Sequence, residues 1–114
     1  MAIIYHIAHQ HDWQQAEKVG AYTADSLETE GFIHCSTKTQ VVEVANNFYK
    51  GQQDLVLLCL DETQLTAEVL YEDSHQNGIL FPHIYGSINL EAVINVIPFP
   101  CDEKGVFQLP PAIT

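Results

Sequence analysis

The chain has 114 residues, a length that predicts one domain over residues 1–114. Hydrophobic residues make up 46% of it and charged residues only 17%, which is typical of a folded globule and excludes a disordered segment. Fifteen acidic residues face four lysines and no arginine, for a formal net charge of −11, so we expect no binding to nucleic acid or to an anionic membrane surface.

The three cysteines, Cys35, Cys59 and Cys101, are odd in number and widely spaced, with no Cys-x-x-Cys pair. Together with the absence of a basic, apolar leader, this indicates a reduced cytoplasmic protein. The longest apolar run is Leu55–Leu60, which is too short to span a bilayer. Nothing in the sequence indicates the oligomeric state.

The first elements in chain order are a strand and a helix. Residues 2–8 are aliphatic and β-branched with no breaker, and they predict a strand. A helix should follow, with Asp12 as its N-cap, Gln15 three residues later, and Gly20 as its end. Residues 25–28 predict a second, short capped turn.

A second strand is expected over residues 31–36, leading directly into a capping box formed by Thr37 and Gln40. The helix behind this box should end at Gly51. Its expected buried stripe follows helical spacing and consists of Val41, Val42, Ala45, Phe48 and Tyr49.

The second half of the chain predicts strands. Residues 55–60 are apolar on both faces, as in a covered central strand, whereas residues 66–72 alternate as in a half-buried one. Residues 81–85 should be short and irregular because of Pro82, and residues 92–97 should form the last strand. An extended tail is then expected from Pro98, Pro100, Pro110 and Pro111.

Helices therefore fall mainly within residues 12–50 and strands dominate the rest. This segregation predicts an α+β fold, with a small, mostly antiparallel sheet, split or barrel-like, and two or three helices.

Histidine is the residue type that could carry chemistry, because the chain has six histidines and few other cationic groups. His6 and His34 lie within predicted strands among apolar neighbours, so each ring should be partly buried. A partly buried imidazole can titrate near neutral pH and bind a hydroxyl or phosphate. A core histidine bonded to a backbone carbonyl is the alternative. The other loop or cap histidines, His9, His11 and His75, are expected at the surface.

Two further segments extend this candidate site. Ser36 lies where a strand passes into the capped helix, so the helix N-terminus could hold an anion there without arginine; its alternative role is as an N-cap. His83 lies in an irregular segment with Tyr85, a combination that often lines pockets, although an ordinary edge turn is equally compatible.

Other constellations are weaker. His6, His34 and His83 match the ligand types of a three-histidine zinc site but not its usual spacing. Ser36 with a histidine lacks the Gly-x-Ser-x-Gly elbow, and Cys35 lacks a family signature. Glu68 and Glu72 share a strand face, which favours a solvated surface over acid–base work.

The chain resembles the family named domain of unknown function 952. The resemblance rests on Ile4–Ile7, Ser26–Leu27, Glu30–Ser36, the Val44–Ala45–Asn46 and Phe48–Tyr49 segments, Tyr71–Glu72 and Phe81–Gly86, and it covers about nine-tenths of the chain in order. That family is similar in architecture to the ADP-ribosyltransferase superfamily, which includes RNA 2'-phosphotransferases that consume NAD.

This resemblance implies an ADP-ribosyltransferase-like fold, with His6 as the first motif and the His34–Ser36 segment as the second. Glu72 and His83 are both candidates for the third. The absence of arginine departs from the phosphotransferases, whose phosphate contacts use arginine, and it disfavours a tRNA substrate.

The leading hypothesis is therefore a pocket for a small molecule, with NAD or an ADP-ribose derivative as the candidate ligand and no cofactor or metal indicated. Its candidate catalytic residues are His6, His34 and His83, and its candidate ligand-binding residues are Ser36, Tyr22, Tyr85 and Glu72. The alternatives are a non-catalytic binding or sensing module and a structural or metal-binding protein.

Overall fold

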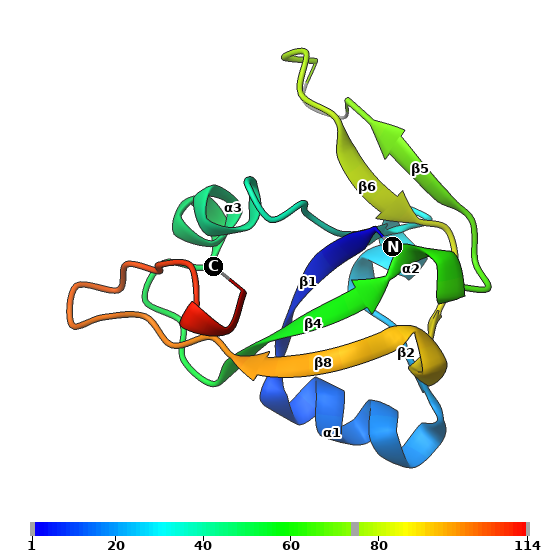
Figure 1. The fold of residues 1–114 in the computed structure, drawn as a ribbon, viewed down its shortest axis with the longest axis horizontal. Helices are drawn as coiled ribbons and strands as arrows, with labels where there is room; N and C mark the ends of the chain where they lie inside the picture. Colours follow the sequence, from blue (N-terminus) through cyan, green and yellow to red (C-terminus); the bar gives the residue numbers. More distant parts are fainter. Residues whose placement is uncertain (1, 74–75, 114) are drawn as a thin grey trace.

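A three-stranded antiparallel sheet forms the centre of the computed structural model, which describes residues 2–73 and 76–113. Strand β4 (Leu55–Asp61) lies between β1 (Ile3–His9) and β8 (Val93–Pro98), as Figure 1 shows. Every residue of β4 is buried, which confirms the central strand predicted from its unbroken apolar run.

Alternate residues of β4 pack into two separate cores, because successive side chains of a strand point to opposite faces. Val56, Leu58 and Leu60 join one core, which also contains Ala16 of helix α1 (Gln10–Val19). Leu55, Leu57 and Cys59 join the other, which includes Val41 and Ala45 of helix α3 (Val41–Phe48). One strand thus holds helices on both sides of the sheet.

Two smaller sheets complete the fold. Strand β6 (Phe81–Ile84) pairs with β3 (Ile33–His34) on one side and β5 (Val69–Glu72) on the other, and this sheet projects above the central one in Figure 1. The short strands β2 (Ala21–Tyr22) and β7 (Ile88–Asn89) pair separately.

The prediction of a small α+β fold with antiparallel sheet structure is confirmed, and all the strand pairs described are antiparallel. The barrel-like variant is wrong, because the strands form three separate ladders that do not close on one another. A single antiparallel bridge between Tyr5 and Ser36 connects β1 to the chain that follows β3.

The α-helices lie in the first half of the chain, as expected, with α2 (Asp25–Thr29) between α1 and α3. Gly20 ends α1 as predicted: its φ is +100°, a conformation that glycine adopts without strain, and its N–H donates to the Ala16 carbonyl. Asp12 is not the N-cap, since α1 begins two residues earlier with His9 before it. Short 3₁₀ turns cover Glu62–Gln64, Leu90–Ala92 and Pro111–Ile113.

The predicted capping box before α3 forms only in part. The Thr37 N–H donates to Gln40 Oε1 at 3.0 Å, but the Thr37 hydroxyl pairs with Thr39, and the helix begins at Val41. It ends at Phe48, before Gly51. Phe48 is 62% exposed, so its place in the predicted buried stripe is wrong.

The strand predictions were least accurate around the smaller sheets. The strand expected over residues 31–36 is reduced to β3 and the Ser36 bridge, and that expected over residues 66–72 begins only at Val69. Residues 81–84 were expected to be irregular but form the middle strand of their sheet. Proline has no backbone N–H to donate, but Pro82 fits in this strand because its hydrogen bond uses the carbonyl. This carbonyl accepts from the Cys35 N–H at 3.0 Å.

The C-terminal segment folds back instead of extending. Phe99 and Phe107 are both 1% exposed and lie in the core beside α3. The Asn46 side chain holds this return, since its amide donates to the Phe107 carbonyl at 3.1 Å and its oxygen accepts from the Phe107 N–H at 2.7 Å. The prolines predicted an extended tail, but two buried aromatic rings outweigh them. No helix within residues 2–73 and 76–113 combines the length and apolar character needed to cross a membrane.

Phe107→Ala should lower the free energy of unfolding by about 3–5 kcal/mol, because it leaves a cavity in the core. Phe48→Ala is the matched control: it removes an equal ring from an exposed position and should cost about 0.5 kcal/mol or less. Urea denaturation followed by circular dichroism measures both. Equal losses would contradict the folded-back C-terminal segment.

Candidate functional site

A wide cleft with a volume of about 1340 Å³ runs across β1, β3 and β6, with α1 and residues 21–26 on one side and α3 on the other. It is larger than the ~300–1,000 Å³ of ordinary ligand pockets, so it can take a ligand of nucleotide size with room for solvent. Five residues predicted for the site line this one cleft: His6, Tyr22, His34, Ser36 and His83.

His6 is buried on β1 and both of its ring nitrogens have partners. Its Nδ1–H donates to the His34 carbonyl at 2.6 Å, and its Nε2 accepts from the Tyr22 hydroxyl at 3.0 Å. Burial lowers the pKa of His6 from 6.5 to about 4, with repulsion from His34 adding to this effect, while the hydrogen bond to the His34 carbonyl opposes it. The ring is therefore neutral at pH 7, and this fixes the direction of both hydrogen bonds.

Tyr22 forms the floor of the cleft beside His6. Its ring meets the imidazole edge-on, with centroids 5.2 Å apart. Burial raises the pKa of Tyr22 most, and the negative charges of Asp12 and Asp25 raise it further. The phenol thus stays protonated, and its O–H donates a hydrogen bond to His6. The lone pairs of its oxygen can still accept a hydrogen bond from a ligand.

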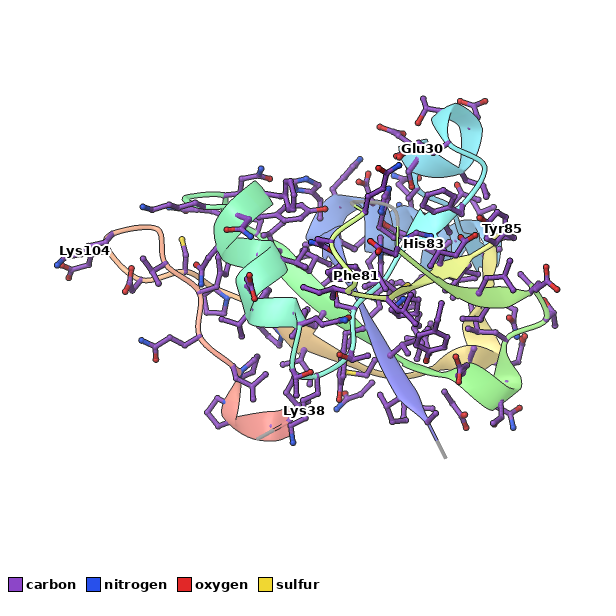
Figure 2. All side chains as sticks on the ribbon, turned by 90° about the horizontal axis from the view of Figure 1, so that it is seen from above. Glu30, Lys38, Phe81, His83, Tyr85 and Lys104 are labelled. Atoms are coloured by element: carbon purple, nitrogen blue, oxygen red, sulfur yellow. The ribbon has the colours of Figure 1, made fainter. Side chains whose placement is uncertain are left out.

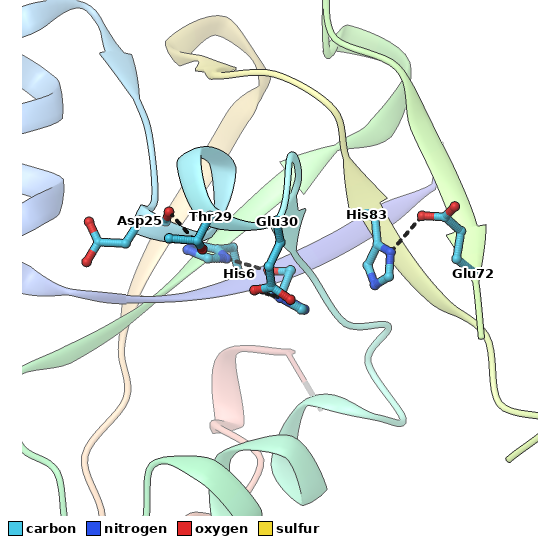
Figure 3. Close-up of polar contacts among 7 residues, drawn as sticks. His6, Asp25, Thr29, Glu30, Glu72 and His83 are labelled. Carbon is cyan, nitrogen blue, oxygen red and sulfur yellow. Dashed lines mark hydrogen bonds and ion pairs between the residues drawn. The ribbon is translucent and has the colours of Figure 1, made fainter. Parts of the chain in front are cut away.

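His34 is more exposed than the other two candidate histidines, with about half of its side chain accessible. Its Nε2 lies 2.9 Å from Glu30 Oε2, an exposed ion pair when the imidazole is protonated. Figure 3 shows Glu30 just after the end of α2. His34 and His83 are direct cross-strand neighbours, and their ring centroids are 5.4 Å apart.

His83 is 1% exposed and hydrogen-bonded at one end only. Its Nδ1–H donates to Glu72 Oε1 at 2.8 Å, whereas its Nε2 is buried without a partner among the described residues. Figure 3 shows the ring held by Glu72 on one side, with its other end turned away from the β5 strand. A buried nitrogen left without a hydrogen bond costs about 1–3 kcal/mol, so a ligand atom that satisfies it would bind favourably.

Glu72 and Tyr85 act behind His83 and do not line the cleft. The Tyr85 hydroxyl donates to the same Glu72 oxygen that accepts from His83. The hydrogen bond from Tyr85, and then that from His83, lowers the pKa of Glu72, so this carboxylate stays ionised and keeps His83 oriented. The same bond raises the pKa of Tyr85. Figure 2 shows His83 and Tyr85 close together along this sheet.

Phe32 stacks against the face of the His83 ring. The two rings are stacked, with centroids 4.0 Å apart and planes only 15° apart, and Phe32 also meets His34 edge-on at 4.9 Å. Stacking and the Glu72 hydrogen bond together leave the His83 imidazole little freedom to rotate.

Ser36 lies in the cleft but not at a helix N-terminus. Its backbone N–H and carbonyl pair with Tyr5, both at 2.8 Å, and α3 begins five residues later at Val41. The predicted anion site at the helix N-terminus is therefore wrong for Ser36. The cause is the turn over residues 37–40, which separates the bridge from the helix.

The remaining predictions can be placed as follows. His9 and His11 are exposed, as expected, although His9 also lines the cleft, while His75 lies outside the described residues. Burial raises the pKa of Cys35, so its thiol stays protonated. Glu68 is exposed and Glu72 is paired with His83, so the two do not act as a carboxylate pair.

The three-histidine zinc alternative finds no support in the geometry. Both nitrogens of His6 are already hydrogen-bonded within the protein. No group of three or more metal-ligating side chains in the described parts of the chain is placed to hold an ion.

Some residues of the site were missed from the sequence. Glu30 pairs with His34, and Asp12 and Asp25 line the cleft beside Tyr22. Helical caps and loop carboxylates are common, so only the fold could reveal that Glu30 contacts a histidine and that Asp12 and Asp25 line the cleft. The four-residue spacing of Glu30 and His34 is the one signal that was available.

The fold and cleft define a small α+β protein in which histidines from three strands, β1, β3 and β6, meet at one side of a split sheet. The model of the family described as protein of unknown function (DUF952) matches residues 7–96. The chain therefore belongs to this family, as its motifs predicted.

Solved structures agree in fold. The crystal structure of protein CC0527 from Caulobacter crescentus is 30% identical, covers 98% of each chain and has a TM-score of 0.88. The solution NMR structure of CC0527 is 30% identical, covers 96% of this chain and 94% of that one, and has a TM-score of 0.75. No curated protein matches the chain. These neighbours do not support the implied likeness to ADP-ribosyltransferases, which stays a prediction.

The pKa of His6 predicts a pH-dependent stability. As the pH falls below about 6.5 the unfolded chain takes up this proton, whereas folded His6 stays neutral down to about pH 4. The free energy of unfolding should therefore fall by about 3 kcal/mol between pH 7 and pH 4 through this residue alone.

Urea unfolding at pH 7, 5.5 and 4.5 measures this effect as the difference between the native protein and His6→Gln. The same comparison with His11→Gln, which replaces an exposed histidine, should show no such difference. Parallel pH curves for the native protein and His6→Gln would contradict the assignment.

Proposed function

We propose that the cleft binds NAD or an ADP-ribose derivative, with His83 and His34 contacting the ribose hydroxyls. The observation that carries this proposal is the buried, unpartnered Nε2 of His83 at a cleft where His6 and His34 also converge. A rigid imidazole with one nitrogen held by a carboxylate and the other free is an arrangement suited to a ligand hydroxyl.

Ribose is a good match for this part of the cleft. Its hydroxyls both donate and accept, so one can donate to His83 Nε2 while a neighbouring hydroxyl meets the half-exposed ring of His34. Ser36, buried at the cleft floor, offers a further hydroxyl. The fixed His83 ring reduces the entropy lost on binding, which favours affinity.

His6 has a different role from the direct contact expected from the sequence. Because its two nitrogens hold the His34 carbonyl and the Tyr22 hydroxyl, it orients both neighbours. Its contribution is to position Tyr22, whose oxygen can still accept a hydrogen bond from the ligand.

The ADP-ribosyltransferase-like reading of the fold belongs to the same proposal. His6 on the first strand and the His34–Ser36 segment fit the first two motifs that the resemblance implies. The two candidates for the third motif, Glu72 and His83, are joined by a hydrogen bond and form one unit. That unit supports placing the third motif at β5 and β6.

A non-catalytic binding module is the second candidate, and the protonation of the buried groups favours it. Burial raises the pKa values of both Tyr22 and Cys35, so neither supplies an anionic nucleophile at neutral pH. A protein with this cleft could bind its ligand without turning it over.

His83→Phe should weaken NAD binding about tenfold, since it keeps the stack on Phe32 but removes the free nitrogen, whose hydrogen bond contributes about 1.4 kcal/mol. Titrations of NAD, ADP-ribose and nicotinamide, followed by calorimetry and by amide NMR shifts, measure this. His11→Phe replaces an exposed histidine outside the cleft and should leave binding unchanged.

The NMR spectra report at the same time whether each variant is folded. If the folded native protein binds none of these compounds at millimolar concentration, the proposal fails. Nicotinamide released from NAD in a His34-dependent way would reject the non-catalytic module, whereas binding without any product would support it.

A further inference from the structure

The cleft walls carry negative charge and no lysine. Asp12 and Asp25 line one side and Glu43 the other, whereas none of the four lysines is among the described lining residues. Lys104 lies on a loop at the opposite end of the molecule from Tyr85 (Figure 2). Among the described lining residues, the histidines are thus the only side chains that could become cationic.

These carboxylates are not neutralised by neighbouring cations. The salt bridges between described residues join His34 to Glu30 and His83 to Glu72, and neither takes up Asp12, Asp25 or Glu43. Asp12 and Asp25 also act on the cleft floor, since their charges add to burial in raising the pKa of Tyr22. Both carboxylates thus line the cleft close enough to act on Tyr22.

Aromatic rings line the same region. Rings of this kind attract cations through their negative faces, by about 0.5–2 kcal/mol each. Those that line the cleft are Tyr5, Tyr22, Phe48, Tyr49 and Phe81. A cleft lined by carboxylates and aromatic rings favours an organic cation and opposes a phosphate, whose usual partners are arginine and lysine.

The unpartnered nitrogen of His83, which also supports the proposed function, indicates which ligand atom would fit here. His83 Nε2 is buried without a partner among the described residues, and in the neutral ring, where Nδ1 donates to Glu72, Nε2 is an acceptor. A ligand N–H or O–H would donate to Nε2 of that form.

From these observations we infer that the cleft selects a cationic nucleoside: a positively charged heterocycle joined to ribose, with few or no phosphates. The charge meets the Asp12 and Asp25 side of the cleft, and a hydroxyl donates to His83. This selectivity rests on the proposed function, in which the ribose of the ligand contacts the histidines of the cleft. It narrows the class of ligand that the proposed function allows.

A series of related ligands tests this selectivity. Nicotinamide riboside, nicotinamide mononucleotide and NAD all keep the positive heterocycle, which ADP-ribose lacks. Phosphate is present in all of them except the riboside, and NAD and ADP-ribose also carry an adenosine. Two unit charges 8 Å apart at an effective dielectric constant near 30 interact by about 1.4 kcal/mol, so affinity should fall on the order of tenfold for each added negative charge. Calorimetric titration at low ionic strength should rank the riboside first and ADP-ribose last.

Two double variants distinguish the effect of charge within the cleft from the effect of the protein's overall charge. Asp12→Asn with Asp25→Asn should weaken riboside binding about tenfold and strengthen ADP-ribose binding, by removing two charges from the cleft. Glu17→Gln with Glu28→Gln removes the same number of charges from α1 and α2 outside this cleft and should change neither.

The outcomes distinguish the two proposals. If ADP-ribose or NAD binds as tightly as the riboside, or if both double variants behave alike, the charge selectivity is overturned while the proposed function stands. If the folded protein binds none of the four compounds, both fail. If the four ligands bind in the expected order of affinity, and Asp12→Asn with Asp25→Asn has the expected effect, both proposals are supported.

Discussion

The reciprocal pairing of Tyr5 with Ser36 is the interaction on which the site depends. Two backbone hydrogen bonds of 2.8 Å join the first strand to the chain behind β3, and the bond from His6 to the His34 carbonyl reinforces them. Because β3 also pairs with β6, His83 is brought to the same cleft as His6. Without this bridge the smaller sheet would have no strand contact with the central one at this edge.

The two buried histidines show how hydrogen-bond partners decide a role. His6 has both nitrogens satisfied within the protein and a lowered pKa, which makes it a fixed, neutral support. His83 is equally buried, but only its Nδ1 is satisfied. An unsatisfied buried polar atom is costly, and its presence beside a cleft is the physical basis for expecting a ligand there.

Charge gives the cleft its second constraint. A protein of net charge −11 without arginine has few means of binding phosphate, and its lysines lie outside the cleft lining. The carboxylates near Tyr22 therefore act on any ligand that enters. The proposed recognition of hydroxyls by histidines and the proposed attraction of a positive heterocycle are compatible, because they would engage different ends of one molecule.

The sequence by itself determined the α+β class, the central buried strand β4, the end of α1 at Gly20 and the family. Each of these depends on local pattern: an unbroken apolar run, a residue that tolerates positive φ, or a motif. It also indicated His6 and His34, because histidines within apolar strands are exceptional, and His83, because it lies with Tyr85 in a segment expected to be irregular.

Only the tertiary structure decided which partner each of these histidines has. Glu72 reaches His83 because β5 and β6 pair in one register, and Glu30 meets His34 through the turn after α2. Long-range pairing also overrode local signals, since the proline-rich end folds back where Phe99 and Phe107 gain a core. The packing of Phe99 and Phe107 joins residues far apart in the chain, which local sequence pattern does not specify.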